Sequence, residues 1–123
     1  MQRKFRLTRS EDFKRVRRSG KSYAHPLVVL IVQAHDKRGS PADQGYVKVG
    51  VAAGRAIGTA VYRNRSKRIL REAMRPLISQ VSSGFDLILI ARPALVTASL
   101  EETRQALLTL LQRAQILISL HES

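Results

Sequence analysis

Residues 62–75 read Tyr62-Arg63-Asn64-Arg65-Ser66-Lys67-Arg68-Ile69-Leu70-Arg71-Glu72-Ala73-Met74-Arg75, and they carry the strongest structural signal in the chain. At about 100° per residue, as in a helix, the stretch separates into two faces. One broad arc is polar and basic, and it consists of Arg63, Asn64, Lys67, Arg68, Arg71 and Arg75. The opposite side is apolar and consists of Tyr62, Ile69, Leu70, Ala73 and Leu77, with Arg65 and Glu72 at the boundary. We predict a helix that packs on a core with one face and presents guanidinium groups, which grip phosphates bidentately, on the other.

The charge of the chain is strongly positive and unevenly distributed. The 123 residues carry a net charge of +13 and are 44% hydrophobic, which indicates one globular domain over residues 1–123. Residues 1–75 contain nineteen Lys and Arg against five Asp and Glu, a balance of +14, whereas residues 76–123 contain three against four, a balance of −1. Positive charges concentrated in this way repel one another unless a polyanion neutralises them. A nucleic acid is therefore the first candidate partner, and an anionic membrane surface is the second.

The sequence shows no set of residues typical of a protein active site or a metal centre. There is no cysteine, and His25, His35 and His121 stand apart without an obvious acidic partner. We therefore predict no catalytic side chain and no protein-only metal site. No apolar run approaches the about 20 residues of a membrane-spanning helix. Residues 1–6 lack the apolar stretch of a signal peptide. Together, these features predict a cytoplasmic protein without a membrane partner.

Turn and capping signals divide the chain into helices and strands. Residues 1–9 are expected to form a basic tail, and the sequence leaves open whether this tail is ordered. Thr8 or Ser10 then caps a short helix that ends near Gly20. The later elements are a strand at 27–32, a polar connector at 35–45, a strand at 46–51 that pairs with the first as a hairpin, a turn at 54–58, the basic helix capped by Thr59 and ended by Pro76, a strand at 85–91, and a leucine-rich helix begun by the capping box of Ser99 and Glu102. This α-β-β-α-β-α order predicts an α+β fold with helices packed on a small mixed sheet.

Residues 50–72 resemble the signature of the bacterial ribonuclease P protein subunit. They read Gly50-Val51-Ala52-Ala53-Gly54-Arg55-Ala56-Ile57-Gly58-Thr59-Ala60-Val61-Tyr62-Arg63-Asn64-Arg65-Ser66-Lys67-Arg68-Ile69-Leu70-Arg71-Glu72. In that family a segment ending in Gly-x-Ala-Val runs into an Arg-Asn-Arg-x-Lys-Arg helix. Further pieces agree in order, namely Arg6-Leu7, Glu11-Asp12-Phe13, Gly20 and Asp86-Leu87-Ile88-Leu89-Ile90-Ala91-Arg92, so the resemblance covers nearly the whole chain.

The resemblance implies an accessory subunit of an RNA-based endoribonuclease that removes the 5′ leader of precursor tRNA. In that family the large RNA holds the active site and its magnesium ions, so we expect no organic cofactor and a protein monomer in a 1:1 complex with RNase P RNA. The residues implied to bind that RNA are Arg63, Asn64, Arg65, Lys67, Arg68 and Arg71. Asn64 is also expected to orient a magnesium ion shared with the RNA. The residues implied to bind the precursor tRNA leader, in a cleft between the first helix and the sheet, are Phe13, Arg17, Lys48 and Arg55.

Two features of the resemblance modify the predictions. The family fold has a left-handed β-α-β crossover through the basic helix, whereas general topology rules favour a right-handed one. In addition, Arg17 and strand residues such as Leu30 stand where family members often carry aromatic rings. Phe13 by itself favours a core anchor, and the resemblance adds base stacking. With fewer rings, we expect leader affinity to depend more on salt and less on base identity.

Two other functions remain open for a basic α+β chain of this size. One is a non-enzymatic ribosomal or chaperone-like RNA-binding protein, which would not stimulate cleavage of precursor tRNA. The other is a DNA-binding regulator that places the basic helix in a major groove and prefers duplex DNA.

Overall fold

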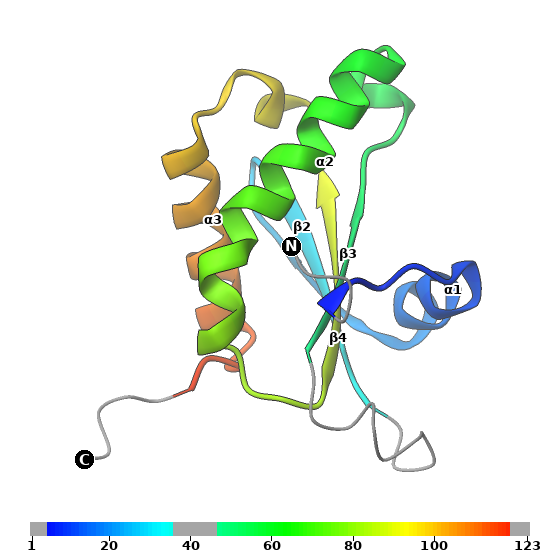
Figure 1. Ribbon diagram of the computed structural model, residues 1–123, viewed down its shortest axis with the longest axis vertical. Helices are drawn as coiled ribbons and strands as arrows, with labels where there is room; N and C mark the ends of the chain where they lie inside the picture. The colour runs from blue at the N-terminus through cyan, green and yellow to red at the C-terminus, as the bar shows by residue number, and fades with distance from the viewer. Residues whose placement is uncertain (1–4, 36–46, 119–123) are drawn as a thin grey trace.

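The computed structural model describes residues 5–35 and 47–118, which form a four-stranded sheet with helices on both faces (Figure 1). The expected connector at 35–45 and His121 therefore lie almost entirely outside the described residues. In chain order the elements are α1 (Ser10–Ser19), β1 (Lys21–Ala24), β2 (Val28–Ala34), β3 (Lys48–Ala52), η3 (Arg55–Ile57), α2 (Ala60–Met74), η4 (Arg75–Gln80), β4 (Phe85–Ala91), η5 (Pro93–Thr97) and α3 (Leu100–Arg113), where η marks a 3-10 helix.

The α+β class and the order of the predicted elements are confirmed, with one strand added. The strand at 85–91 and the stop of the basic helix before Pro76 are as predicted. At α3, the Ser99 side chain accepts a hydrogen bond from the Glu102 backbone, and the Glu102 carboxylate accepts one from Ser99. The predicted cap of α1 is wrong, because Arg9 holds the N-cap position without a side-chain bond. Thr59 holds the N-cap position of α2, again without a side-chain bond.

The strand pairing differs from the hairpin that the sequence predicted. The sheet order is β1-β2-β4-β3, so β4 lies between the two strands that were expected to pair. The hairpin partner of β2 is β1, a short strand that the sequence analysis missed, and β3 pairs in parallel with β4. Five of the seven residues of β4 are buried, so this strand gains most from a central position with both faces covered.

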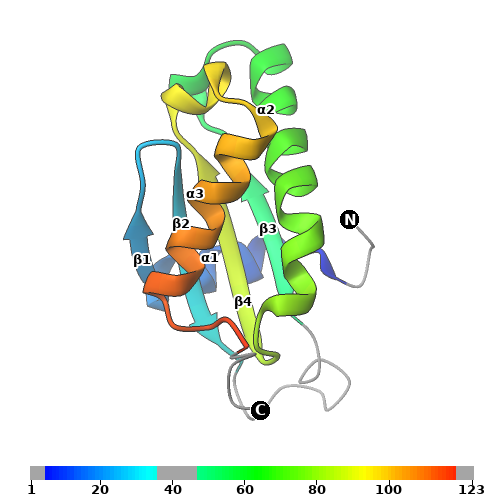
Figure 2. The same ribbon diagram turned by 90° about the vertical axis from the view of Figure 1, so that its left-hand side faces the viewer.

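The crossover from β3 through α2 to β4 is left-handed, as the family resemblance implied. In Figure 2 both strands run upward, α2 lies in front of the sheet, and β4 stands to the left of β3. A right-handed connection with the helix in front would place the second strand to the right. The crossover therefore places α2 over the face of the sheet, beside its edge strand β3 (Figure 2).

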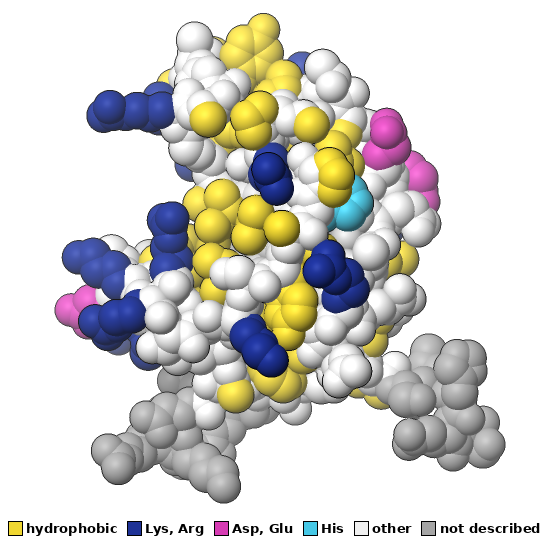
Figure 3. Space-filling view, turned by 180° about the vertical axis from the view of Figure 1, so that it is seen from behind, with side chains coloured by type: hydrophobic (Ala, Val, Ile, Leu, Met, Phe, Trp, Pro, Cys, Tyr) yellow, Lys and Arg dark blue, Asp and Glu magenta, His cyan; other side chains and the backbone are white. Residues whose placement is uncertain are grey.

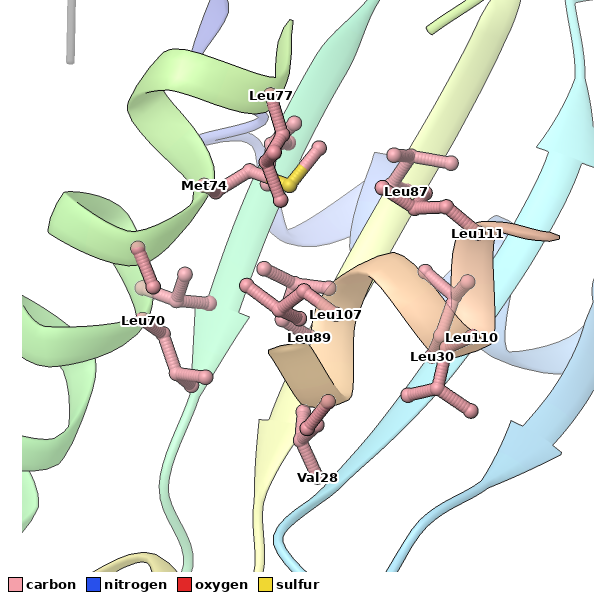
Figure 4. Packing of buried hydrophobic residues seen from close by; sticks show 14 of the residues in the cluster. Val28, Leu30, Leu70, Met74, Leu77, Leu87, Leu89, Leu107, Leu110 and Leu111 are labelled. Atoms are coloured by element: carbon pink, nitrogen blue, oxygen red, sulfur yellow. The ribbon is translucent and has the colours of Figure 1, made fainter. Parts of the chain in front are cut away.

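The main core lies between the sheet and the helices α2 and α3 (Figure 4). The fully buried large side chains of this layer come from both helices and from β2 and β4, and they include Leu30, Leu70, Met74, Leu87, Leu89, Leu107, Leu110 and Leu111. Burial of each such side chain contributes about 1.5–3 kcal/mol, so this layer holds α2 in place. The side chains of Leu70, Met74 and Leu77 set which face of α2 points outward.

A smaller cluster holds α1 on the opposite face of the sheet (Figure 1). Val16 of α1 is fully buried with Ile31 and Ile88, and Leu7 completes the cluster. Leu7 belongs to a segment that the sequence placed in a basic tail. Its backbone N–H donates to the Val49 carbonyl at 2.9 Å, so the segment from Phe5 to Leu7 runs beside the β3 edge. Residues 1–4 lie outside the described part.

Candidate nucleic-acid interface

Helix α2 and Arg75, which directly follows it, carry the set of cations that, together with Asn64, we call the basic face. It consists of Arg63, Asn64, Arg65, Lys67, Arg68, Arg71 and Arg75. Asn64, Arg65, Arg68 and Arg75 are exposed, while Arg63, Lys67 and Arg71 are half-buried at the margin next to the core. The structure thus brings all six residues implied to bind RNase P RNA onto one helix.

The apolar side of α2 is rotated from the predicted one. Leu70, Ala73 and Leu77 are buried as predicted, and Ser66 and Met74 join them at 2% and 0% exposure. Tyr62 was expected on the core side, but 46% of it is exposed. Tyr62 stands in the first turn of α2, whereas the buried residues of the helix begin only at Ser66.

The cations of the basic face lack acidic partners within the described residues, with one exception. Arg75 lies 3.7 Å from Glu72, and both side chains are largely exposed. The Nε atom of Arg63 is buried without a hydrogen-bond partner in the described part of the molecule. Burial lowers the pKa of the Arg71 guanidinium from its usual value, and the positive charge of Arg6 lowers it further. An anion bound next to Arg71 would offset both its burial and its repulsion by Arg6, because a negative charge stabilises the positive guanidinium.

The other face of the sheet is only partly covered by α1. Strand register arranges the side chains of this face in three rows across β3, β4 and β2, namely Lys48-Asp86-Gln33, Gly50-Ile88-Ile31 and Ala52-Ile90-Val29. Helix α1 packs on the middle row, and its Arg15 reaches the first row. The third row stays half-buried and forms the floor of a hollow beside α1. We call this hollow the α1 cleft. Figure 3 shows a hollow on this side, with hydrophobic side chains on its floor and Lys and Arg side chains above and below it.

Phe13 stands on the sheet at the edge of the α1 cleft. A Cβ placed on Gly50 would lie 2.4 Å from Phe13 Cζ, so only glycine lets the ring approach the strand this closely. Phe13 is half-buried and packs on the small cluster. The ring is therefore both an anchor for α1 and a partly exposed aromatic surface.

The structure places the other three predicted leader-binding residues around the same sheet face. Arg17 is exposed and follows Phe13 by one turn of α1. Lys48 begins β3 in the first row, and the exposed Arg55 follows β3 at the far end of the α1 cleft. Leu30 does not take part, since it faces α2 and α3 and is fully buried. The β2 residue that faces the cleft is Val29.

A buried aspartate, Asp86, with polar and cationic partners ties α1 to the sheet, and the sequence analysis missed this contact. The Asp86 side chain is 5% exposed, and its carboxylate accepts a hydrogen bond from Arg15 Nη2 at 2.6 Å and lies 2.8 Å from His35 Nε2. The hydrogen bond from Arg15 to Asp86 raises the pKa of Arg15. Arg15 also donates to Gln33 and, at 3.3 Å, to Asp12. His35 and Asp86 are 51 positions apart in the sequence, and only the fold brings them into contact.

The described residues do not build a metal centre of their own. No group of three or more His, Cys, Asp or Glu side chains in residues 5–35 and 47–118 is arranged to hold a metal ion. Asn64, the residue expected to orient magnesium, is exposed on α2. Across the same ranges, no helix has the length and apolar character required to cross a membrane.

Comparison with known sequences identifies relatives over almost the full chain. The Ribonuclease P family model matches residues 1–115. A ribonuclease P protein component from Herpetosiphon aurantiacus is 43% identical over 116 residues, which cover 94% of this chain and 89% of that protein. The component from Brevibacillus brevis is 35% identical over 117 residues, with 95% and 88% coverage.

Solved structures agree with this assignment. The RNase P protein from Thermotoga maritima superposes with a TM-score of 0.73 at 28% identity, covering 88% of this chain and 96% of that one. The Staphylococcus aureus RNase P protein has the same fold, with a TM-score of 0.76 at 24% identity and coverage of 93% and 98%. The chain therefore belongs to the ribonuclease P protein family, the RNA-binding protein components of a tRNA-processing ribonucleoprotein.

Proposed function

We propose that this chain binds RNase P RNA through the basic face of α2 and the single-stranded 5′ leader of precursor tRNA through the α1 cleft. It thereby promotes endonucleolytic removal of the leader and production of mature tRNA 5′ ends. The protein acts as a monomer in a 1:1 complex with the RNA. The observation that carries the proposal is the presence of two distinct surfaces suited to RNA on one rigid sheet.

The basic face supports the first contact because, apart from Arg75 beside Glu72, its cations have no acidic partner within the described residues. Guanidinium groups at the helical repeat match phosphates on a folded RNA, and Arg65 and Arg68 are exposed with no acidic partner there. If about six phosphates are neutralised, log affinity falls with log salt at a slope of about −4 to −5, by the coefficient for single strands.

The α1 cleft supports the second contact by combining a ring, an apolar floor and flanking cations. Phe13 offers a stacking surface, and Ile90 and Val29 form an apolar floor beside it. Arg17 and Arg55 stand at its rims, where phosphates of a leader would pass. A leader bound here lies on the opposite side of the sheet from the α2–α3 layer, so both RNA contacts form at once.

Catalysis in this proposal belongs to the RNA. The metal chemistry is supplied by magnesium ions that RNA phosphates hold, and magnesium keeps several waters and takes few protein oxygens. The exposed amide of Asn64 fits a role in orienting the water shell of one such ion. The basic face lowers the repulsion between phosphates where these ions gather.

Reconstitution at low magnesium tests the proposal directly. The protein is combined with RNase P RNA, and cleavage of precursor tRNA is compared for wild type, Arg65→Ala and Phe13→Ala. We expect Arg65→Ala to weaken binding to the RNA. We expect Phe13→Ala to raise the KM for leader-bearing substrate while leaving affinity for mature tRNA unchanged.

Arg104→Ala is the matched control, since it removes one positive charge from α3 at a residue that belongs neither to the basic face nor to the α1 cleft. Its RNA affinity should stay close to that of wild type. Failure of the wild-type protein to stimulate cleavage would support an RNA-binding protein without a role in processing. Equal losses for Arg65→Ala and Arg104→Ala would show that only net charge matters.

A further inference from the structure

Two large apolar side chains stand exposed side by side at the start of α2. Val61 is 74% exposed and Tyr62 is 46% exposed. Within the described residues, Leu100 and Ile118 are the other large hydrophobic side chains with comparable exposure. Single exposed apolar residues are common, but an adjacent pair inside a charged surface indicates a contact.

One exposed cation, Arg65, lies beside this pair. Arg65 follows Tyr62 by three residues and Val61 by four, and both spacings place side chains next to one another on a helix, with Cβ atoms about 5–6 Å apart. Arg65 is exposed, and no acidic side chain in residues 5–35 and 47–118 lies within 4 Å of it. The pair is therefore an exposed apolar spot next to a positive charge that no acidic side chain of the described residues neutralises.

The turn before α2 supports one edge of the Tyr62 ring. Gly58 has a φ of 122°, which favours glycine, and a Cβ built there would lie 3.5 Å from Tyr62 Cδ2. The ring thus rests near the Gly58 backbone at one edge, while nearly half of the side chain faces solvent. A ring supported in this way loses little further freedom when a flat partner covers it.

We propose that Tyr62 stacks on an unpaired base of the RNA bound by α2, while Arg65 contacts the phosphate of that nucleotide. This inference rests on the proposed function, because it deepens the contact between the basic face and RNase P RNA. Stacking accepts any base, so it adds affinity and position without sequence readout. A protein partner fits less well, since it would have to bring both apolar and strongly acidic groups to one helical turn.

Four substitutions separate stacking from simple apolar burial. Tyr62→Ala removes the ring, Tyr62→Leu keeps apolar area without a ring, and Tyr62→Phe and Tyr62→Trp keep an aromatic face. The chain contains no tryptophan, so Tyr62→Trp also introduces a unique fluorophore. Each variant is titrated with RNase P RNA at fixed salt and magnesium, and each is checked by thermal unfolding. The exposed Leu100→Ala, at the start of α3, is the matched control.

We expect Tyr62→Ala and Tyr62→Leu to weaken RNA binding about 5- to 150-fold, the equivalent of about 1–3 kcal/mol for one stacked base. Tyr62→Phe, Tyr62→Trp and Leu100→Ala should bind within about threefold of wild type. Tryptophan fluorescence of Tyr62→Trp should be quenched on addition of RNA.

Different outcomes would overturn the inference in distinguishable ways. Wild-type affinity in Tyr62→Ala, or retained affinity in Tyr62→Leu, rejects stacking. If Arg65→Ala still weakens binding in that case, the proposed function stands and only the stacking contact fails. If neither Tyr62→Ala nor Arg65→Ala changes RNA affinity, both fail. A change in self-association of Tyr62→Ala on gel filtration, with RNA affinity unaltered, would assign the pair to contact with a second copy.

Discussion

Replacing Asp86 with asparagine tests the contact that holds α1 on the sheet. The carboxylate is almost fully buried and receives Arg15 at 2.6 Å on one oxygen, with His35 at 2.8 Å from the other. Asparagine keeps the shape but offers a single acceptor oxygen. Its amide nitrogen must then face Arg15 or His35, and against Arg15 two donors meet. The variant therefore leaves the guanidinium without its counter-charge in either orientation, and it also loses the hydrogen bond from Arg15 where the amide nitrogen faces the guanidinium.

The expected loss follows from the burial of Asp86. A hydrogen bond to a charged group contributes about 1.5–3 kcal/mol, so Asp86→Asn should lower the free energy of unfolding by about that amount. For a chain of this length, about 3–6 °C of Tm corresponds to 1 kcal/mol, which predicts a fall of about 5–18 °C. Thermal and urea unfolding followed by circular dichroism measure both quantities.

Asp12→Asn is the matched control because Asp12 also binds Arg15, but at 3.3 Å and with 34% of its side chain exposed. Even with its favourable place in the first turn of α1, we expect it to cost less than about 1 kcal/mol. A double-mutant cycle of Asp86→Asn with Arg15→Gln should give a coupling of at least about 1 kcal/mol. Equal effects of the two Asp substitutions, or a coupling near zero, would refute the view that this buried pair anchors α1.

Three further predictions concern the two surfaces. Gly50→Ala should push Phe13 from the sheet, lower the free energy of unfolding by about 1–3 kcal/mol and weaken leader binding. Gly50→Ala combined with Phe13→Leu should recover stability but not leader affinity. Unfolding experiments measure the stability, and substrate titrations measure the leader affinity. Arg71→Gln removes a partly buried charge and its repulsion with Arg6. The free energy of unfolding of the free protein should therefore stay within about 0.5 kcal/mol of wild type or rise slightly, while affinity for RNase P RNA falls. An equal loss of stability and of RNA affinity would argue against a binding role. Loss of one phosphate contact, as in Arg65→Ala, should reduce the slope of log affinity against log salt by about 0.7–1, and an unchanged slope would show that Arg65 does not neutralise a phosphate.

Local signals in the sequence predicted most elements and the surface rich in cations. The strand at 85–91 combines the apolar run at 87–91 with a preceding glycine, and the Ser99 capping box is a short-range motif, so each could be recognised without knowledge of the rest. The alternation of cations and apolar residues along 62–75 likewise placed Leu70 and Ala73 in the core. The family motif supplied the left-handed crossover, which general topology rules would have predicted wrongly.

The errors concern relations between distant segments. The strand at Lys21–Ala24 has almost no apolar alternation, and it forms because β2 offers a free edge beside it. The sequence also could not show that β4 would separate β2 from β3, since strand order depends on where α2 returns the chain. Tyr62 was assigned to the wrong side because the buried arc of a helix depends on how it packs against two neighbours at once.

Residue type and spacing along the chain were thus enough to establish a basic amphipathic helix, an apolar strand, their order and the family. The α1 cleft, the burial of Asp86 between Arg15 and His35, and the exposure of Tyr62 arise only when the whole sheet assembles. The physical reason is the range of the interactions. Helical periodicity and capping act within a few residues, whereas strand order and the burial of a carboxylate depend on contacts between residues 51 and 71 positions apart.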